Sequence, residues 1–248
     1  MNLNLLKSLS FDYLTKFFSN SPNSFAIGKN DQHKPNLLLG KFKLIPLYNA
    51  NDKVIYGLQF PYFNLNNFNS DESEKLFLFL EWKLNILIND YFNNNSQLFN
   101  FNFTNDINNL IVKLMPYEME TPYSDSLILA KYTAWILSAN KKYTNSFLKD
   151  PISFLNNFHN NLPLDITKLK NKSFGLNKVS LMGLKINYNL IKPNVIAQKG
   201  NTVEITKGSC PIYFIPSLNN GFLDEDNFSI LSKVGTVNIK VKLFFNVN

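Results

Sequence analysis

The feature that most constrains the fold is a change of hydrophobic period within residues 124–245. Apolar residues recur three and four positions apart in residues 126–140 and 151–160, which predicts two helices. From residue 178 onward the apolar residues fall in short runs, and residues 237–243 alternate strictly between apolar and polar. This order predicts helices followed by a mostly antiparallel sheet, with a leucine- and proline-containing exit between them at residues 162–166.

The N-terminal half carries its own signals. Aromatic and leucine residues at helical spacing predict a short helix over residues 11–18, and two apolar runs at residues 37–47 and 54–60 predict a β-hairpin. Ser70-Asp71-Glu72 provides an N-cap and an acidic first turn for a long helix that ends near Phe92. We expect its buried face to carry Leu76, Phe79, Leu80, Leu84, Leu87, Ile88 and Tyr91.

Together these elements predict a mixed α+β chain: an N-terminal helix and β-hairpin, central helices, and mostly antiparallel C-terminal strands. We expect two regions, residues 1–123 and residues 124–248, intertwined in one subunit that is stable within an assembly. A chain of 248 residues can bury a sizeable core. Its longest apolar runs, such as residues 76–80, are far too short to cross a bilayer, so we expect no membrane insertion.

The charge of the chain is carried in an unusual way. The formal net charge is +7, and all 25 basic residues are lysines. Without arginine the chain lacks the planar fork that dominates guanine readout and bidentate phosphate contacts. The lysines are also spread along the sequence, apart from a short cluster at residues 168–172 that we interpret as a solvated loop. We therefore predict no nucleic-acid partner, and we attribute the lack of arginine to an AT-rich genome.

Candidate catalytic and metal-binding residues are few. His33 and His159 have no cysteine, histidine or acidic residue at ligand spacing, so we predict no metal and no cofactor. Cys210 has no histidine near it in sequence to act as a base, and a small buried thiol is the favoured interpretation. The acidic run Asp224-Glu225-Asp226 is expected in a solvated turn. We predict no catalytic residues and no enzymatic activity.

The second half of the chain carries a series of short motifs in a fixed order. They are Tyr143-Thr144-Asn145-Ser146, Phe154-Leu155, Phe158, Leu162-Pro163-Leu164-Asp165-Ile166, Phe174-Gly175 and Met182-Gly183. In this order the motifs resemble those of the TssG wedge subunit of type VI secretion baseplates. The N-terminal half matches more loosely. Trp82 and Lys83 stand where that family carries a His-Arg pair. We interpret the chain as a divergent TssG-like subunit, with specific motifs only in its second half.

The resemblance implies a structural role in protein secretion and virulence. TssG-like subunits join TssF-like core subunits, a TssE-like subunit near the sheath and TssK-like adaptors in a wedge around the spike hub, so the resemblance implies a hetero-oligomer. The implied location is the bacterial cytoplasm, at the inner face of a membrane complex. Two alternatives stay open: a structural protein of a contractile phage tail or other virion, and, less favoured, an orphan enzyme or lysine-based nucleic-acid binder.

Two aromatic segments are predicted to be loops that bind these partners. Apolar and aromatic side chains offer large contact areas at interfaces. The candidate partner-binding residues are Phe60, Pro61, Tyr62 and Phe63 in one segment and Met115, Pro116, Tyr117, Met119, Pro122 and Tyr123 in the other. The alternative is that these aromatics fold back onto the core of their own chain.

Overall fold

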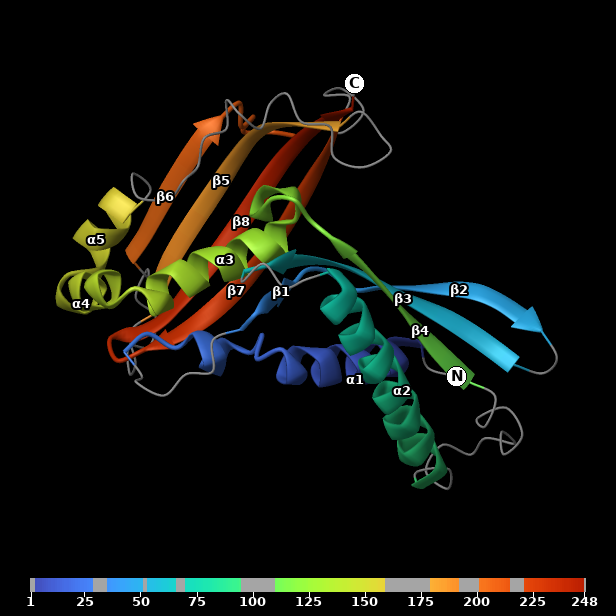
Figure 1. Cartoon of the computed structure of the whole chain (residues 1–248). Helices are drawn as coiled ribbons and strands as arrows, with labels where there is room; N and C mark the ends of the chain where they lie inside the picture. The colour runs from blue at the N-terminus through green and yellow to red at the C-terminus, as the bar shows by residue number, and fades with distance from the viewer. Residues whose placement is uncertain are drawn as a thin grey trace. The chain divides into compact units, whose positions relative to one another are not determined.

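A computed structural model describes residues 3–28, 35–50, 53–65, 70–94, 110–158, 179–191, 201–214 and 221–247 (Figure 1). The chain forms two compact units. Unit 1 comprises Met1–Ser19 and Pro35–Glu120, and unit 2 comprises Asn20–Lys34 and Thr121–Asn248. The domain division that the sequence predicts, between residues 123 and 124, stays a prediction.

Unit 1 is built on a small mixed sheet. Its strands are β1 (Leu37–Leu39), β2 (Lys43–Ala50), β3 (Lys53–Asn64) and β4 (Leu110–Glu118). Strand β3 pairs antiparallel with β1 and β2 along one edge, and parallel with β4 along the other. The β2–β3 pair is the predicted hairpin.

Two helices complete the core of unit 1, α1 (Leu3–Phe17) and α2 (Ser70–Asn94). Helix α2 buries Phe77, Leu80, Leu84, Ile88 and Phe92 against the apolar residues of α1 and the sheet. The predicted start of this helix, with Asp71 and Glu72 in the first turn, is confirmed. Its predicted inner face is partly wrong, because Phe79 and Leu87 are exposed.

Unit 2 begins with short 3₁₀ turns, η1 (Pro22–Phe25) and η4 (Pro122–Ser124), and three helices, α3 (Ser126–Ala139), α4 (Lys141–Lys149) and α5 (Pro151–Phe158). Asp125 caps α3, since its Oδ1 accepts a hydrogen bond from the Ile128 N–H at 2.9 Å. Asn140 caps α4 in the same way. Helix α3 carries nine buried residues and is the central helix of this unit.

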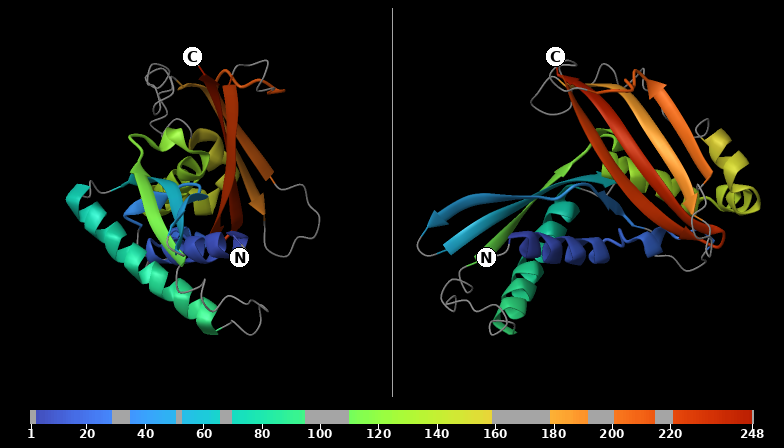
Figure 2. Two further views of the ribbon diagram at one scale, coloured as in Figure 1. Left: turned by 90° about the vertical axis from the view of Figure 1, so that its right-hand side faces the viewer. Right: turned by 180° about the vertical axis from the view of Figure 1, so that it is seen from behind.

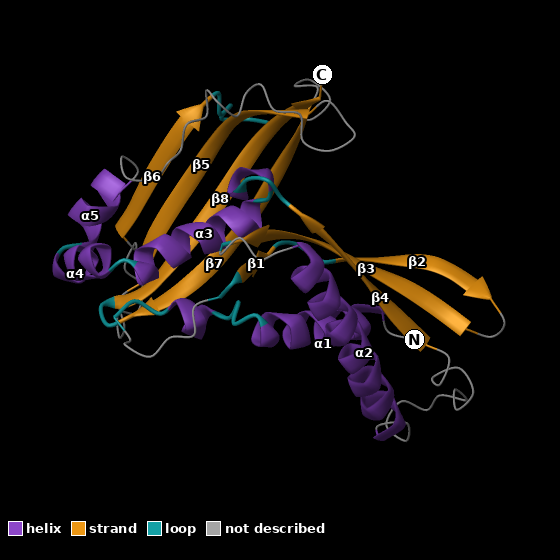
Figure 3. Ribbon diagram, in the orientation of Figure 1, coloured by secondary structure: helices purple, strands orange, loops and turns teal. Residues whose placement is uncertain are grey.

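The sheet of unit 2 contains β5 (Val179–Ile191), β6 (Asn201–Gly208), β7 (Gly221–Ser232) and β8 (Gly235–Val247). The strand order is β6-β5-β8-β7 and every neighbouring pair is antiparallel. The predicted alternation over residues 237–243 is confirmed in β8, where the apolar residues are buried and the polar residues between them are partly exposed. Helix α3 lies across one face of this sheet (Figures 1 and 3).

The predicted α+β fold class is confirmed. The two predicted loops are wrong in part: residues 60–63 belong to β3 and residues 115–118 belong to β4. The proline in the second segment suggested a loop, but Pro116 lies opposite Phe60 in a regular parallel ladder. The predicted exit at residues 162–166, the lysine cluster at residues 168–172, His33 and His159 lie outside the described residues.

Candidate functional site

The two faces of the unit 2 sheet differ in chemistry. Asp224 of β7 faces α3, because its Oδ2 accepts a hydrogen bond from the Ser126 N–H at 2.7 Å. Side chains alternate along a strand, so Glu225 points to the opposite face. In the view from behind, α3 lies behind the strands and no described helix crosses the face nearer the viewer (Figure 2).

That second face, which we call the polar face, consists of three rows set by strand register. Each residue in a row is exposed or partly exposed. The rows are Thr206, Lys185, Lys242 and Glu225; then Glu204, Asn187, Lys240 and Asn227; then Thr202, Asn189, Asn238 and Ser229. Lysine, amide and hydroxyl groups therefore stand side by side across four strands.

Ion pairs hold the lysines of the polar face in place. Lys185 Nζ lies 2.7 Å from Glu204 Oε1, and Lys242 Nζ lies 3.0 Å from Glu225 Oε2. Lys240 also pairs with Glu225. The hydrogen bond from Lys240, together with that from Lys242, keeps the pKa of the Glu225 carboxyl below its usual range. Three lysines face two carboxylates, so these rows carry a net charge of +1.

The asparagines of the polar face have spare hydrogen-bonding capacity. The Oδ1 atoms of Asn187 and Asn189 are buried and have no hydrogen-bond partner among the residues that the structure describes. A buried acceptor without a partner costs about 1–3 kcal/mol. Because both atoms are buried, a ligand on this surface would reach them only after the side chains rotate outward.

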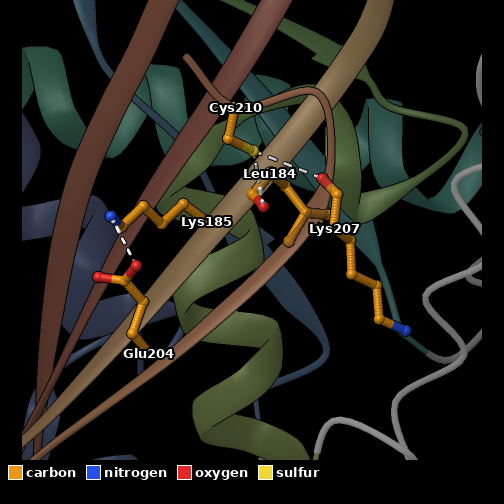
Figure 4. A network of polar contacts seen from close by, with 5 residues as sticks. All are labelled: Leu184, Lys185, Glu204, Lys207 and Cys210. Atoms are coloured by element: carbon orange, nitrogen blue, oxygen red, sulfur yellow. Dashed lines mark hydrogen bonds and ion pairs between the residues drawn. The ribbon is translucent and has the colours of Figure 1, made fainter. Parts of the chain in front are cut away.

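A hollow of about 350 Å³ borders the first row of the polar face, where the 209–214 segment meets the sheet. Cys210 lines it, with its Sγ 3.3 Å from the Leu184 carbonyl oxygen and 3.5 Å from that of Lys207 (Figure 4). Burial raises the pKa of the Cys210 thiol, so at neutral pH the residue is the protonated form and not the nucleophilic thiolate. Figure 4 also shows the Lys185–Glu204 ion pair, while the Lys207 side chain points away.

The opposite face of the sheet anchors α3. Lys131 of this helix is 1% exposed, with its Nζ 5.8 Å from the centre of the Phe228 ring. Burial lowers the pKa of Lys131 to about 7, and the charges of Asp125 and Asp226 oppose that shift. The acidic run at residues 224–226 therefore lies in β7, and its predicted place in a turn is wrong: Asp224 contacts the start of α3.

The predicted partner-binding residues divide into buried and exposed sets. Phe60, Pro61 and Tyr62 of β3 are buried, as are Pro122 and Tyr123. These residues follow the alternative interpretation, in which the aromatics join the core of their own chain. Phe63, Pro116 and Met119 are partly buried, while Met115 and Tyr117 are exposed on β4. Partner binding by any of them stays a prediction.

The two units differ in net charge. Unit 2 contains 17 lysines and 8 acidic residues, for a net charge of +9, whereas unit 1 contains 8 lysines and 10 acidic residues, for a net charge of −2. Most of this difference is already present along the sequence, because residues 121–248 contain 15 lysines and 7 acidic residues. The signal that could have revealed the polar face is the alternation of lysine and asparagine at residues 185–189 and 238–242.

Comparison with known proteins defines the class to which this chain belongs. The sequence profile of a family described as mitochondrial ribosomal protein (VAR1) matches residues 45–246, which include parts of both units. The small ribosomal subunit protein uS3m of Schizosaccharomyces pombe (strain 972 / ATCC 24843) is 30% identical over 255 residues, covering 100% of each chain. The chain is thus related to ribosomal proteins along its whole length. It belongs to the VAR1 family of mitochondrial ribosomal proteins.

This membership corrects several predictions. The TssG-like assignment is wrong, as are the phage-tail alternative, the secretion and virulence role, the baseplate partners and the bacterial cytoplasmic location. The exclusion of nucleic acid is wrong as well, because the family is ribosomal. The prediction that the chain is not an enzyme is confirmed by the same membership.

No described helix is both long and apolar enough to span a membrane. Among the residues that the structure describes, no three histidine, cysteine or acidic side chains lie close enough together to hold a metal ion.

Proposed function

We propose that this chain is a structural protein of the small subunit of the mitochondrial ribosome, and that unit 2 contacts ribosomal RNA through its polar face. The observation that carries the proposal is the match to a ribosomal protein family over residues 45–246, supported by a small-subunit relative that aligns with the whole chain. The charge of +9 on unit 2 favours the same unit as the RNA-binding part.

The chemistry of the polar face suits an RNA backbone. Lysine binds phosphate as a point charge, without the forked geometry of arginine. Asparagine, threonine and serine can donate to phosphate oxygens and exchange hydrogen bonds with 2′-hydroxyl groups. The glutamates do not prevent this, because exposed lysine–carboxylate pairs contribute only about 0–1 kcal/mol and a phosphate can replace the carboxylate.

An RNA-binding measurement tests the polar face. The variant combines Lys185→Gln, Lys240→Gln and Lys242→Gln in the full chain, and the probe is transcribed small-subunit ribosomal RNA. Log affinity decreases with log salt concentration. If the three lysines contact phosphates, the magnitude of this negative slope should be smaller by about 2–3 in the variant.

The matched control removes the same charge from unit 1. It combines Lys7→Gln, Lys16→Gln and Lys83→Gln, three exposed positions. We expect it to keep the wild-type salt slope. If the salt slope changes equally in the two variants, RNA binding depends only on net charge. If the slope of the polar-face variant is unchanged, the polar face does not contact the RNA.

A further inference from the structure

The outer side of α2 in unit 1 carries a row of large exposed apolar residues. Its members, which we call the α2 stripe, are Leu78 (60% exposed), Phe79 (47%), Trp82 (57%), Ile86 (38%) and Leu87 (47%). Leu78, Trp82 and Ile86 are spaced four residues apart, so they lie in one line along the helix. Exposed apolar residues that gather in this way usually mark a site of interaction.

The stripe is held outward by specific contacts on the inner side of α2. The Asn85 side chain donates to the Val112 carbonyl oxygen at 2.9 Å and accepts from the Val112 N–H at 2.8 Å. Glu81 Oε2 accepts from the Leu114 N–H at 2.8 Å. These side chains satisfy backbone groups of β4 that the pairing with β3 leaves free, so the helix cannot rotate the stripe inward without breaking three hydrogen bonds.

Two aromatic side chains of the stripe lie close to each other and to a lysine. The rings of Phe79 and Trp82 lie 6.0 Å apart, and Lys83 Nζ lies 4.8 Å from the centre of the Trp82 ring. Tryptophan is enriched among the residues that dominate protein interfaces. The lysine covers part of the ring while leaving the rest of the stripe open.

The charge around the stripe indicates what kind of partner it takes. Helix α2 contains five acidic residues and two lysines, for a net charge of −3, in a unit of net charge −2. Phosphate groups would be repelled from this surface, so RNA is a poor occupant. A protein segment with apolar side chains and flanking basic residues complements both the stripe and its acidic surroundings.

We propose that the α2 stripe is the docking site for a neighbouring ribosomal protein, which contacts it through a basic segment with apolar side chains. This inference rests on the proposed function. It divides the work of the chain: unit 2 contacts RNA, and unit 1 contacts a protein.

Site-specific photo-crosslinking in assembled small subunits tests the proposal. Benzoylphenylalanine replaces Trp82 in the full chain, and particles from a mitochondrial lysate are separated by sedimentation before irradiation. We expect crosslinks from position 82 to a lysine- or arginine-rich peptide of another protein. A chain with benzoylphenylalanine at Lys240, on the polar face, is the matched control and should crosslink to RNA.

Every other outcome at position 82 overturns the inference. These outcomes are a crosslink to RNA, a crosslink within the chain or to a second copy, and the absence of any crosslink in particles that contain the chain. Absence of the chain from the small-subunit fractions is a separate result, seen before irradiation, and it overturns the proposed function together with this inference.

A second variant tests the role of charge. Glu72→Lys combined with Glu74→Lys reverses two exposed charges on α2 without touching the stripe. Combined with benzoylphenylalanine at position 82, it should cause loss of the protein crosslink, whereas Glu72→Gln with Glu74→Gln should weaken it less. Equal crosslinking in both would show that the partner is not recognised by basic residues.

Discussion

Lys131 should make the stability of unit 2 rise with pH. In the unfolded chain this lysine holds its proton up to about pH 10.4, whereas burial in the folded chain lowers its pKa to about 7. Below pH 7 both states carry the proton, so the cost of the buried charge is present in full. Above pH 7 the folded state binds fewer protons than the unfolded state, so the free energy of unfolding increases.

The size of the effect follows from the two pKa values. Between about pH 7 and about pH 9, the free energy of unfolding of unit 2 should increase by about 2 kcal/mol. The range ends there because tyrosines begin to titrate in the unfolded chain near pH 10. Tyr123, whose pKa burial raises to about 12, then acts in the opposite direction and lowers stability.

The chain offers a clean assay for this prediction. It contains two tryptophans, Trp82 in α2 of unit 1 and Trp135 in α3 of unit 2. With Trp82→Phe as the background, urea unfolding followed by fluorescence reports on α3 alone. Lys131→Met in this background should abolish the increase between pH 7 and pH 9. If the Trp82→Phe protein with Lys131 shows no increase, or if the Lys131→Met variant keeps it, the titration of Lys131 does not cause the pH effect.

Three further predictions concern contacts that position the two surfaces. Asp224→Ala removes the acceptor of the Ser126 N–H and should lower the free energy of unfolding of unit 2 by about 1–2 kcal/mol, as measured by urea unfolding. A loss below about 0.3 kcal/mol, which is about the error of such a measurement, would contradict this prediction. Asn85→Ala leaves the backbone N–H and C=O of Val112 without their partner, so it should destabilise unit 1 by about 2 kcal/mol and speed amide exchange in β4. Unchanged amide exchange would show that Asn85 does not hold α2 against β4. Gly183→Ala places a Cβ against the Ser209 carbonyl oxygen and should lower the melting temperature of unit 2. An unchanged melting temperature would show that the backbone at Ser209 moves aside at no cost.

The sequence predicted best where local signals and tertiary structure agree. The start of α2 was predicted because an N-cap and acidic residues mark it, and the alternation in β8 was predicted because one face of the strand is buried. The end of β4 was missed because Pro116 and Pro122 indicate a loop, although Pro116 lies in a parallel ladder that only tertiary structure reveals.

Two other features were hidden for physical reasons. The polar face combines residues from four strands, so its rows exist only after strand register is fixed. The outward direction of Phe79 and Leu87 depends on the hydrogen bonds of Asn85 to β4, which turn the helix. The TssG resemblance failed because short leucine–glycine and proline steps recur in unrelated α+β chains, and an order of elements does not by itself define a function.

We propose that this chain is part of the small subunit of the mitochondrial ribosome. Sedimentation of a mitochondrial lysate, with the chain and the ribosomal RNA followed in every fraction, tests it most directly. We expect the chain to sediment with the small-subunit RNA and to move with it into whole ribosomes when the subunits join. A chain that stays near the top of the gradient, while the small-subunit RNA sediments without it, would show that the protein is not part of this subunit.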